Sequence, residues 1–264
     1  METLSVLLVI GSTPFMIEPE NLQLRQFNKQ DNVIAFDSLT QQKGYYSATF
    51  DTSRHKVIVK EKKFGEHHAD TIDVVLPSQI LHSPNSLTDD QVSDLNLLSK
   101  GKELGFFLAD RDTALRLSGV LLNIDLAGTD FTIDWRLKEL RETEFPWKNI
   151  SLRDMEMSDN GEEYLCFYHI DTHELYIPGE DLFELPQNVV LLEIPNEIKL
   201  DPVAVAREFG IGETDLLPDH PFQMNIAARV TPLSETGLSA FIAEYIKRRD
   251  HLTADDSLVR RRGR

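Results

Sequence analysis

A short run of metal-ligand side chains, EHHAD, brings Glu66, His67, His68 and Asp70 together within five residues. Imidazole nitrogens and carboxylate oxygens are both ligands of zinc and of related divalent ions. Adjacent residues of an extended segment point to opposite sides, however, so this run does not by itself surround one ion. We interpret EHHAD as an exposed loop, and a metal-dependent hydrolase built on His67 and His68 is the less favoured alternative.

A second pair of histidines, His169 and His173, has Asp171 and Glu174 beside it. A spacing of four residues would place both rings on one face of a helix, where they could share a metal ion. This segment instead joins two alternating apolar runs, as a hairpin turn does. The sequence therefore predicts turn chemistry here and no bound metal or cofactor.

A carboxylate followed by an E-x-K sequence, the pattern of Asp181, Glu197 and Lys199, can hold magnesium beside a phosphodiester. Here Glu197 and Lys199 follow Pro195, which we expect to end the preceding strand, so the pattern does not lie on a strand. The GIGE sequence at 210–213 lacks the third glycine of a dinucleotide-binding loop and follows a helical stretch. We expect it to mark the end of a helix.

Other catalytic motifs are missing from the sequence, which has no nucleophile elbow, P-loop, H-E-x-x-H or zinc-finger spacing. Cys166 is the only cysteine, so neither a disulfide within the chain nor a cysteine-based zinc site is possible. We expect no catalytic residues, no cofactor and no enzyme activity. Cross-strand packing in the core is favoured over a binding face for the aromatic residues Trp135, Trp147, Tyr164 and Tyr168.

Residues 4–84 and 120–202 carry the same order of prolines, aromatics and alternating apolar residues, at an offset of 116 to 118 positions. The clearest part is LPSQILHSP at 76–84, which recurs as IPNEIKLDP at 194–202. Collinear matches over this length indicate an internal duplication. The matched pairs are Thr13 and Thr129, Phe15 and Phe131, Ile17 and Ile133, Leu24 and Leu140, Arg25 and Arg141, Asn32 and Asn149, Asp37 and Asp154, Tyr46 and Tyr164, His55 and His173, Pro77 and Pro195, Ile80 and Ile198, and Pro84 and Pro202.

Each copy is expected to consist mostly of strands arranged in hairpins. The first proline of the quoted motif, Pro77 or Pro195, ends a strand because proline lacks the N–H group that a strand ladder needs. The second, Pro84 or Pro202, begins a helix, where a missing N–H costs nothing. The residues expected to cap helix N-termini are Ser83, Thr88 and Asp201, and Gly210 is expected to end a helix.

Residues 236–249 place apolar side chains at helical spacing and basic ones in the last turn, which predicts an amphipathic helix. Residues 251–264 are polar and charged and are expected to be disordered. The arginines of this tail are consistent with contact to nucleic acid, with contact to an acidic partner and with a solubilising role. The candidate partner-binding residues are Leu238, Phe241, Ile242, Tyr245, Arg248, Arg249, Arg260, Arg261 and Arg262.

The charge of the chain limits its partners. Its 264 residues include 44 acidic and 27 basic ones, for a formal net charge of -17. Such a surface repels phosphate, which disfavours broad binding to nucleic acid or to an anionic membrane. No apolar run approaches the roughly 20 residues that a membrane helix needs. With a single cysteine as well, we expect a soluble, cytoplasmic protein.

We predict an α+β protein of two tandem homologous β-rich modules, built from antiparallel hairpins and short helices, with a C-terminal amphipathic helix. The modules are expected at 1–100 and 120–212, joined by 101–119 and followed by a helical segment at 213–250 and the basic tail at 251–264. Paired modules suit binding surfaces, so we expect a non-enzymatic interaction, scaffold or adaptor protein within a larger assembly. The alternative is a nucleic-acid-associated accessory factor that uses the tail.

Overall fold

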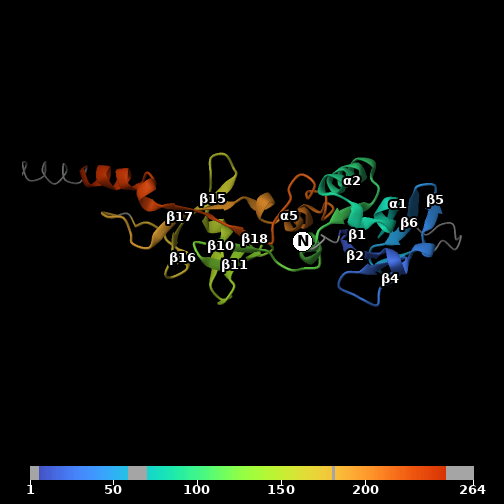
Figure 1. The fold of residues 1–264 in the computed structure, drawn as a ribbon. Coiled ribbons are helices and arrows are strands. Elements are labelled where there is room, and N and C mark those ends of the chain that lie inside the picture. Colours follow the sequence, from blue (N-terminus) through green and yellow to red (C-terminus); the bar gives the residue numbers. More distant parts are fainter. Residues whose placement is uncertain (1–5, 59–69, 180–181, 248–264) are drawn as a thin grey trace, which may run out of the picture. The chain divides into compact units, whose positions relative to one another are not determined.

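Residues 6–58, 70–179 and 182–247 are described by the computed structural model of the chain (Figure 1). They form an α+β fold with several antiparallel sheets and short helices, so the expected fold class is confirmed at that level. Within these ranges no helix is both long enough and apolar enough to span a membrane. His67 and His68 lie outside the described residues.

Contacts within the chain divide it into two compact units, each made of two separate segments. Unit 1 consists of Met1–Leu122 and Glu197–Met224, and unit 2 consists of Asn123–Asn196 and Asn225–Arg264. Residues 197–212, which we expected within the second module, are grouped here with unit 1. Residues 197–224 therefore belong to unit 1, although in the chain they follow residues 123–196 of unit 2.

Unit 1 contains a five-stranded sheet in the order β4-β3-β2-β1-β9. Strands β1 to β4 form consecutive antiparallel hairpins, and β9 pairs antiparallel with the other side of β1. All four residues of β1 are buried, which agrees with its place inside the sheet. The strands are β1 (Leu7–Ile10), β2 (Thr13–Glu18), β3 (Gln23–Gln26), β4 (Val33–Ala35) and β9 (Phe106–Ala109).

A second sheet of unit 1 is built around β6, which pairs with β5, β7 and β8. Its apolar residues Tyr46, Phe50, Val74 and Leu76 belong to one buried cluster with those of the first sheet. Phe15 of β2 meets the ring of Phe50 edge-on, with centroids 5.8 Å apart. The core of unit 1 thus lies between its two sheets. The strands are β5 (Thr40–Gln42), β6 (Tyr45–Asp51), β7 (Lys56–Val57) and β8 (Thr71–Pro77).

Two helices of unit 1, Asp89–Lys102 and Pro202–Phe209, lie where the sequence predicts, whereas Ser78–His82, Arg111–Leu117 and Glu197–Leu200 are helices that were not predicted. Thr88 caps α2 within a capping box, the Asp201 side chain caps α5, and Gly210 ends α5 with φ 68. Ser83 makes no side-chain cap, so that expectation is wrong: it precedes only a three-residue 3-10 turn, which leaves few N–H groups to cap. The helices are α1 (Ser78–His82), α2 (Asp89–Lys102), α3 (Arg111–Leu117), α4 (Glu197–Leu200) and α5 (Pro202–Phe209), and the 3-10 turns are η1 (Pro19–Asn21), η2 (Phe36–Ser38) and η3 (Pro84–Ser86).

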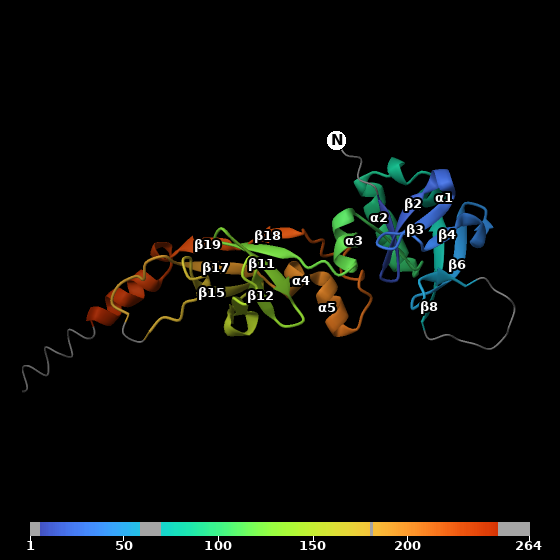
Figure 2. The same cartoon turned by 90° about the horizontal axis from the view of Figure 1, so that it is seen from below.

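Unit 2 also has two sheets, in the orders β13-β12-β11-β10-β18 and β14-β15-β17-β19, with β16 beside β15 (Figure 2). Phe131 and Tyr168, one from each sheet, meet edge-on with centroids 6.4 Å apart. Strand β18 runs parallel to β10, whereas β9 runs antiparallel to β1. The strands are β10 (Asn123–Leu126), β11 (Thr129–Asp134), β12 (Glu139–Glu142), β13 (Asn149–Ser151), β14 (Glu156–Met157), β15 (Glu163–His169), β16 (Glu174–Leu175), β17 (Val189–Pro195), β18 (Asn225–Ala227) and β19 (Arg229–Pro232), with 3-10 turns η4 (Leu152–Asp154) and η5 (Leu233–Glu235).

The strand registers of the two units can be compared position by position. Leu24 faces β4 as Leu140 faces β13, a difference of 116 positions. Tyr46 faces β8 as Tyr164 faces β17, a difference of 118 positions. The offset therefore changes once, in the turn that joins β5 to β6 and β14 to β15.

Two of the expected residue pairs do not fit these registers. Asn149 faces Arg141 across β12 and β13, and the residue in that place in unit 1 is Val33 instead of Asn32. The pairing of Asn32 with Asn149 is therefore wrong by one residue, as is that of Asp37 with Asp154. The extra residues of the second stretch lie in the turn between β14 and β15, which is later in the chain than the sequence comparison placed them.

A carboxylate on the surface of unit 1 has a strongly shifted pKa. Glu18 of β2 accepts from Arg25 of β3, with Nε and Oε1 2.7 Å apart, and also from Gln23 and Asn21. These hydrogen bonds, that of Arg25 first, lower the pKa of Glu18 from 4.5 to about 2. A lowered folded-state pKa stabilises the fold above the unfolded pKa, and this contribution is lost as the pH falls towards 2.

We expect Glu18→Gln to lower the free energy of unfolding by about 1 kcal/mol at pH 7, less than the pKa shift alone implies because the pair faces water. At pH 3, between the two pKa values, the loss should be less than half as large, since the unfolded carboxyl is then protonated. Urea unfolding followed by circular dichroism at both pH values measures it. An equal loss at pH 7 and pH 3 would contradict the linkage.

Candidate functional site

Three polar side chains of unit 2, from separate elements, meet in what we call the Thr–His–Glu cluster. Thr129 Oγ1 lies 3.4 Å from Nε2 of His173, and Nδ1 of His173 lies 3.0 Å from Oε2 of Glu142. Thr129 begins β11, Glu142 ends β12, and His173 lies in the turn between β15 and β16. The cluster therefore links the two sheets of unit 2.

Local backbone geometry places two of these side chains. His173 has φ 61, and its N–H donates to the carbonyl of His169 at 2.9 Å, so the predicted turn is confirmed. Ala127 and Gly128 both have positive φ, which makes the tight turn that returns the chain along β10 and starts β11 at Thr129. Turn residues therefore bring the hydroxyl and the imidazole to the same end of the two sheets.

The Glu142 carboxylate faces one nitrogen of the His173 ring, and its side chain is only 3% exposed. Nδ1 and Oε2 lie 3.0 Å apart, but neither atom has a partner in hydrogen-bond geometry. The tautomer with its hydrogen on Nδ1 is the one that would suit a facing carboxylate and leave Nε2 to accept from the Thr129 hydroxyl. The His173 side chain is 26% exposed, so the imidazole reaches the surface while the carboxylate does not.

Tyr168 of β15 lies beneath this cluster, fully buried, with its hydroxyl beside Thr129. Burial, together with the nearby negative charges of Glu142 and Asp125, raises the pKa of Tyr168 to about 12, and the neighbouring Thr129 hydroxyl opposes this although it does not meet the Tyr168 hydroxyl in hydrogen-bond geometry. Tyr168 therefore stays a neutral phenol at physiological pH. Cys166, on the same strand, has its pKa raised to about 12 by burial, so its thiol is a poor nucleophile.

An exposed aromatic pair stands beside the cluster, in the loop between β12 and β13. Trp147 is 75% exposed, and its ring meets that of Phe145 edge-on at 5.3 Å. Lys148 bridges the pair and the cluster, because its Nζ lies 5.7 Å from the Phe145 ring and 3.9 Å from Oε2 of Glu142. The expectation that Trp147 is a core residue is wrong: its loop turns it away from both sheets. Trp135 and Tyr168 are buried as expected.

Unit 1 holds a related but uncharged arrangement. Thr13 Oγ1 lies 2.7 Å from Nδ1 of His55, which also has positive φ. In place of the carboxylate, Gln26 accepts from the amide of Asn32 at 2.8 Å, and Asn32 also donates to the carbonyl of His55. A Thr–His contact is thus common to both units, whereas the carboxylate contact is present in unit 2.

The expected partner-binding residues are divided between described and undescribed parts of the chain. Residues 238–247 are helical, as predicted. Ile242 is buried, Tyr245 meets the ring of Phe183, and Leu238 is half-buried, so the apolar face of this helix packs largely on unit 2 itself. Phe241 is exposed. Arg248, Arg249, Arg260, Arg261 and Arg262 lie outside the described residues.

The other suspected sites are not assembled in the described residues. Glu197 and Lys199 lie on α4, after β17 ends at Pro195, and Asp181 lies outside the described residues. His169 uses its ring to accept from the N–H of Thr172. Within the ranges given above, no group of three or more His, Cys, Asp or Glu side chains could hold a metal ion.

A surface hollow of about 1020 Å³ in unit 1 is lined by parts of β1, α2, β9 and the segment after α5. Four of its five charged side chains are already used within the chain, including Asp73, which accepts from Thr49. Lys100 pairs with Asp219, and Asp215 accepts from the N–H of Gly212. Glu213 pairs with Arg207. The hollow therefore offers little charge for a ligand.

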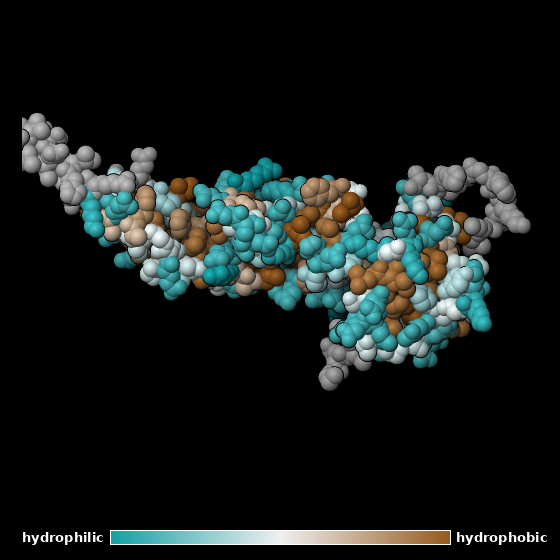
Figure 3. All heavy atoms as spheres, turned by 90° about the horizontal axis from the view of Figure 1, so that it is seen from above, coloured by the Kyte–Doolittle hydropathy of each residue, from teal (hydrophilic) through white to brown (hydrophobic). Residues whose placement is uncertain are grey.

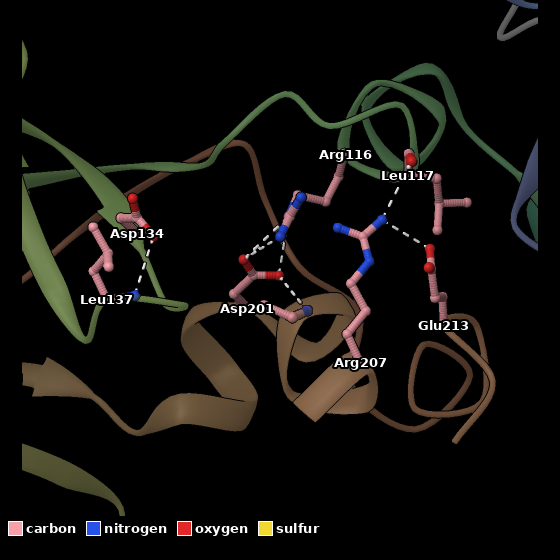
Figure 4. Close-up of polar contacts among 8 residues, drawn as sticks. Arg116, Leu117, Asp134, Leu137, Asp201, Arg207 and Glu213 are labelled. Atoms are coloured by element: carbon pink, nitrogen blue, oxygen red, sulfur yellow. Dashed lines mark hydrogen bonds and ion pairs between the residues drawn. The ribbon is translucent and has the colours of Figure 1, made fainter. Parts of the chain in front are cut away.

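A buried ion pair in unit 1 joins α3 to α5. The guanidinium of Arg116 donates to both carboxylate oxygens of Asp201 at 2.8 to 3.1 Å (Figure 4). Arg207 stands beside it and donates to the carbonyl of Leu117 and to Glu213. Both partners of the Arg116–Asp201 pair are almost completely buried, so this contact serves architecture and not ligand binding.

Comparison with protein-family models, with curated proteins and with solved structures gives no match for this chain. Its function has to be argued from the arrangement of its own residues. Of the Thr–His–Glu cluster, the sequence comparison paired Thr129 and His173 with Thr13 and His55 but assigned no functional role to them. It gave no signal for Glu142, since its place in unit 1 holds an uncharged residue.

Proposed function

We propose that the chain consists of two copies of one β-rich module, and that it works by binding another protein through the second copy. The common strand order of the two units supports the duplication. Equivalent backbone hydrogen bonds support it too: Phe36 donates to Leu22 at 2.8 Å, and Leu152 donates to Lys138 at 2.8 Å. Such agreement in irregular segments is stronger support than agreement between strands, because turns are less constrained by ladder pairing.

Comparison of the copies separates architecture from function. Positions that keep the same residue type in both, such as the buried phenylalanines Phe15 and Phe131, hold the sheets together. Among the many positions that differ, Glu142 and Lys148 of unit 2 stand where the register places Gln26 and Asn32 in unit 1. The aromatic pair lies in the same loop as Lys148. This end of unit 2 therefore carries charged and exposed aromatic groups in place of the uncharged residues of unit 1.

The observation that carries the proposal is that the Trp147 ring, which contacts the ring of Phe145, is largely exposed to water. Exposing a large aromatic ring to water is unfavourable, and tryptophan is the residue most enriched among the energetic centres of protein interfaces. Figure 3 shows that apolar side chains are exposed in several separate places on one face, with polar ones between them. We assign function to the Phe145–Trp147 pair because charged groups border it, as a polar rim borders an interface.

The test is affinity purification from the native host with the full chain as bait. We expect Trp147→Ala to weaken capture of the principal partner tenfold or more, which corresponds to about 1.4 kcal/mol. Phe209→Ala is the matched control, since Phe209 is 74% exposed but lies in unit 1 at the end of α5. Capture that is unaffected by Trp147→Ala, or reduced equally by both changes, would refute the assignment.

A further inference from the structure

The Thr–His–Glu cluster has the order of groups that activates a hydroxyl as a nucleophile. A hydroxyl oxygen faces one imidazole nitrogen, and a carboxylate faces the other. We propose that Thr129 is an activated nucleophile that takes the acyl group of a neutral ester, with His173 as general base and Glu142 as a positioning residue. This activity is separate from the proposed binding function and does not depend on it.

The comparison with unit 1 argues that this order of groups is more than a way to hold the sheets together. In unit 1 the corresponding contacts are uncharged: Thr13 meets Nδ1 of His55 directly, and Asn32 donates to Gln26 and to the carbonyl of His55. In unit 2 the ring presents Nε2 to the hydroxyl and Nδ1 to a carboxylate, which is the polarity that general-base catalysis needs. A buried carboxylate costs free energy unless it is paired. Unit 1 has the uncharged Gln26 at the position of Glu142, so its sheets are held together without such a carboxylate.

Burial falls from the carboxylate to the hydroxyl of the cluster, so the proposed nucleophile is the group that a substrate can reach. Glu142 and the Nδ1 edge of His173 are buried, whereas Thr129 and the rest of the imidazole are partly exposed. The 3.4 Å between the hydroxyl and Nε2 is long, as such contacts often are without substrate. Lys148 places a positive charge 3.9 Å from the Glu142 carboxylate, at the end of the cluster away from Thr129.

The reaction begins when Thr129 Oγ1 attacks the ester carbonyl carbon and its proton passes to Nε2 of His173. The carbon–oxygen bond to the alcohol breaks, and the proton on Nε2 goes to the departing oxygen, so that an alcohol is released and Thr129 is left as an ester. Water, deprotonated by His173 in the same way, then hydrolyses that ester to a carboxylic acid and restores Thr129. A neutral ester is the expected class, because the net charge of -17 repels anionic substrates.

p-Nitrophenyl acetate added to the full chain tests the proposal. We expect a burst of p-nitrophenolate with one acetyl group on Thr129, located by peptide mass spectrometry. Thr129→Val should abolish this acetylation and Thr129→Ser should keep it. His173→Gln should slow the acetylation about 100-fold, which is a typical rate contribution of a general base. Glu142→Gln should slow it and move the pH profile of the rate to lower pH, because the imidazolium loses its carboxylate partner.

Thr13→Val is the matched control, since it removes the corresponding hydroxyl of unit 1 and should leave the burst unchanged. Tryptophan fluorescence checks that each unit 2 variant is folded, because Trp135 and Trp147 both lie in unit 2. The proposal is overturned if Thr129 is acetylated no faster than Thr13, or if folded Thr129→Val releases p-nitrophenolate as fast as the unchanged protein. Loss of partner capture by Trp147→Ala would bear on the binding function alone.

Discussion

Asp201→Asn is expected to destabilise unit 1 by about 3–5 kcal/mol, because it leaves the Arg116 guanidinium buried without a counter-charge. The two side chains are 3% and 0% exposed, so water cannot replace the lost carboxylate. Asparagine keeps an oxygen that can accept from the N–H of Ala204, where Asp201 caps α5. The substitution therefore tests the ion pair more than the helix cap. Arg116→Met should cost a similar amount.

Unit 1 can be followed separately from unit 2 in this experiment. The two tryptophans, Trp135 and Trp147, both belong to unit 2, so their fluorescence reports the unfolding of that unit. Amide hydrogen exchange in residues 89–117 reports on unit 1. We expect Asp201→Asn to speed exchange in 89–117 and to leave the fluorescence midpoint in urea close to that of the unchanged chain.

Two further variants distinguish a buried charge from general damage. The double variant Arg116→Met with Asp201→Asn removes both charges and should regain more than half of the lost stability, since two uncharged side chains can replace a buried pair. Lys100→Ala breaks the exposed pair with Asp219 and should cost less than about 1 kcal/mol. If Asp201→Asn costs no more than Lys100→Ala, the pair is not a main support of unit 1.

The second large effect is expected at Asn96 of α2, which acts in place of a neighbouring strand. Its side chain donates to the carbonyl of Leu108 at 2.8 Å and accepts from the N–H of the same residue at 2.6 Å. Ser99, one turn later, bonds both backbone groups of Phe106. Strand β9 ends its sheet, so these two side chains satisfy backbone groups that would otherwise form an open edge.

We expect Asn96→Ala to lower the free energy of unfolding by about 2–4 kcal/mol, since it leaves two buried backbone groups of Leu108 without partners. Exchange of the Leu108 amide is the most direct readout. Leu97→Ala, an exposed change on the same helix, is the control and should cost little. Asn96→Asp keeps the acceptor but loses the donor, so it should also destabilise. Slow exchange of the Leu108 amide in Asn96→Ala would refute this role of Asn96.

Local sequence signals located many of the elements, but they missed β9 and α3 in the expected connector 101–119 and the strands β18 and β19 in the segment 213–250, which was expected to be helical. Alternating apolar residues located the strands, and both prolines at strand ends, Pro77 and Pro195, lie where β8 and β17 stop. The caps Thr88 and Asp201 were also predictable. Each of these depends on the conformation of a few consecutive residues and on which backbone N–H groups they can satisfy. For this reason they can be read without knowing the fold.

The candidate site was not predicted from the sequence. Thr129 and His173 appeared among the matched pairs, but His173 was assigned to a turn, and nothing marked Glu142 as their partner. Trp147 was assigned to the core because an aromatic residue near strands usually packs there. Whether a side chain in a loop turns inward depends on the path of that loop, which neighbouring residues do not specify.

The sequence by itself determined the hairpins of the two β-rich stretches and the helices α2 and α5, because those choices are made by neighbours along the chain. Only the tertiary structure decided that Glu197–Met224 belongs to unit 1, that Arg116 and Asp201 meet across 85 residues, and that Thr129 lies beside His173. Contacts between distant segments arise from how buried faces and polar groups are satisfied together, and many arrangements share the same local pattern.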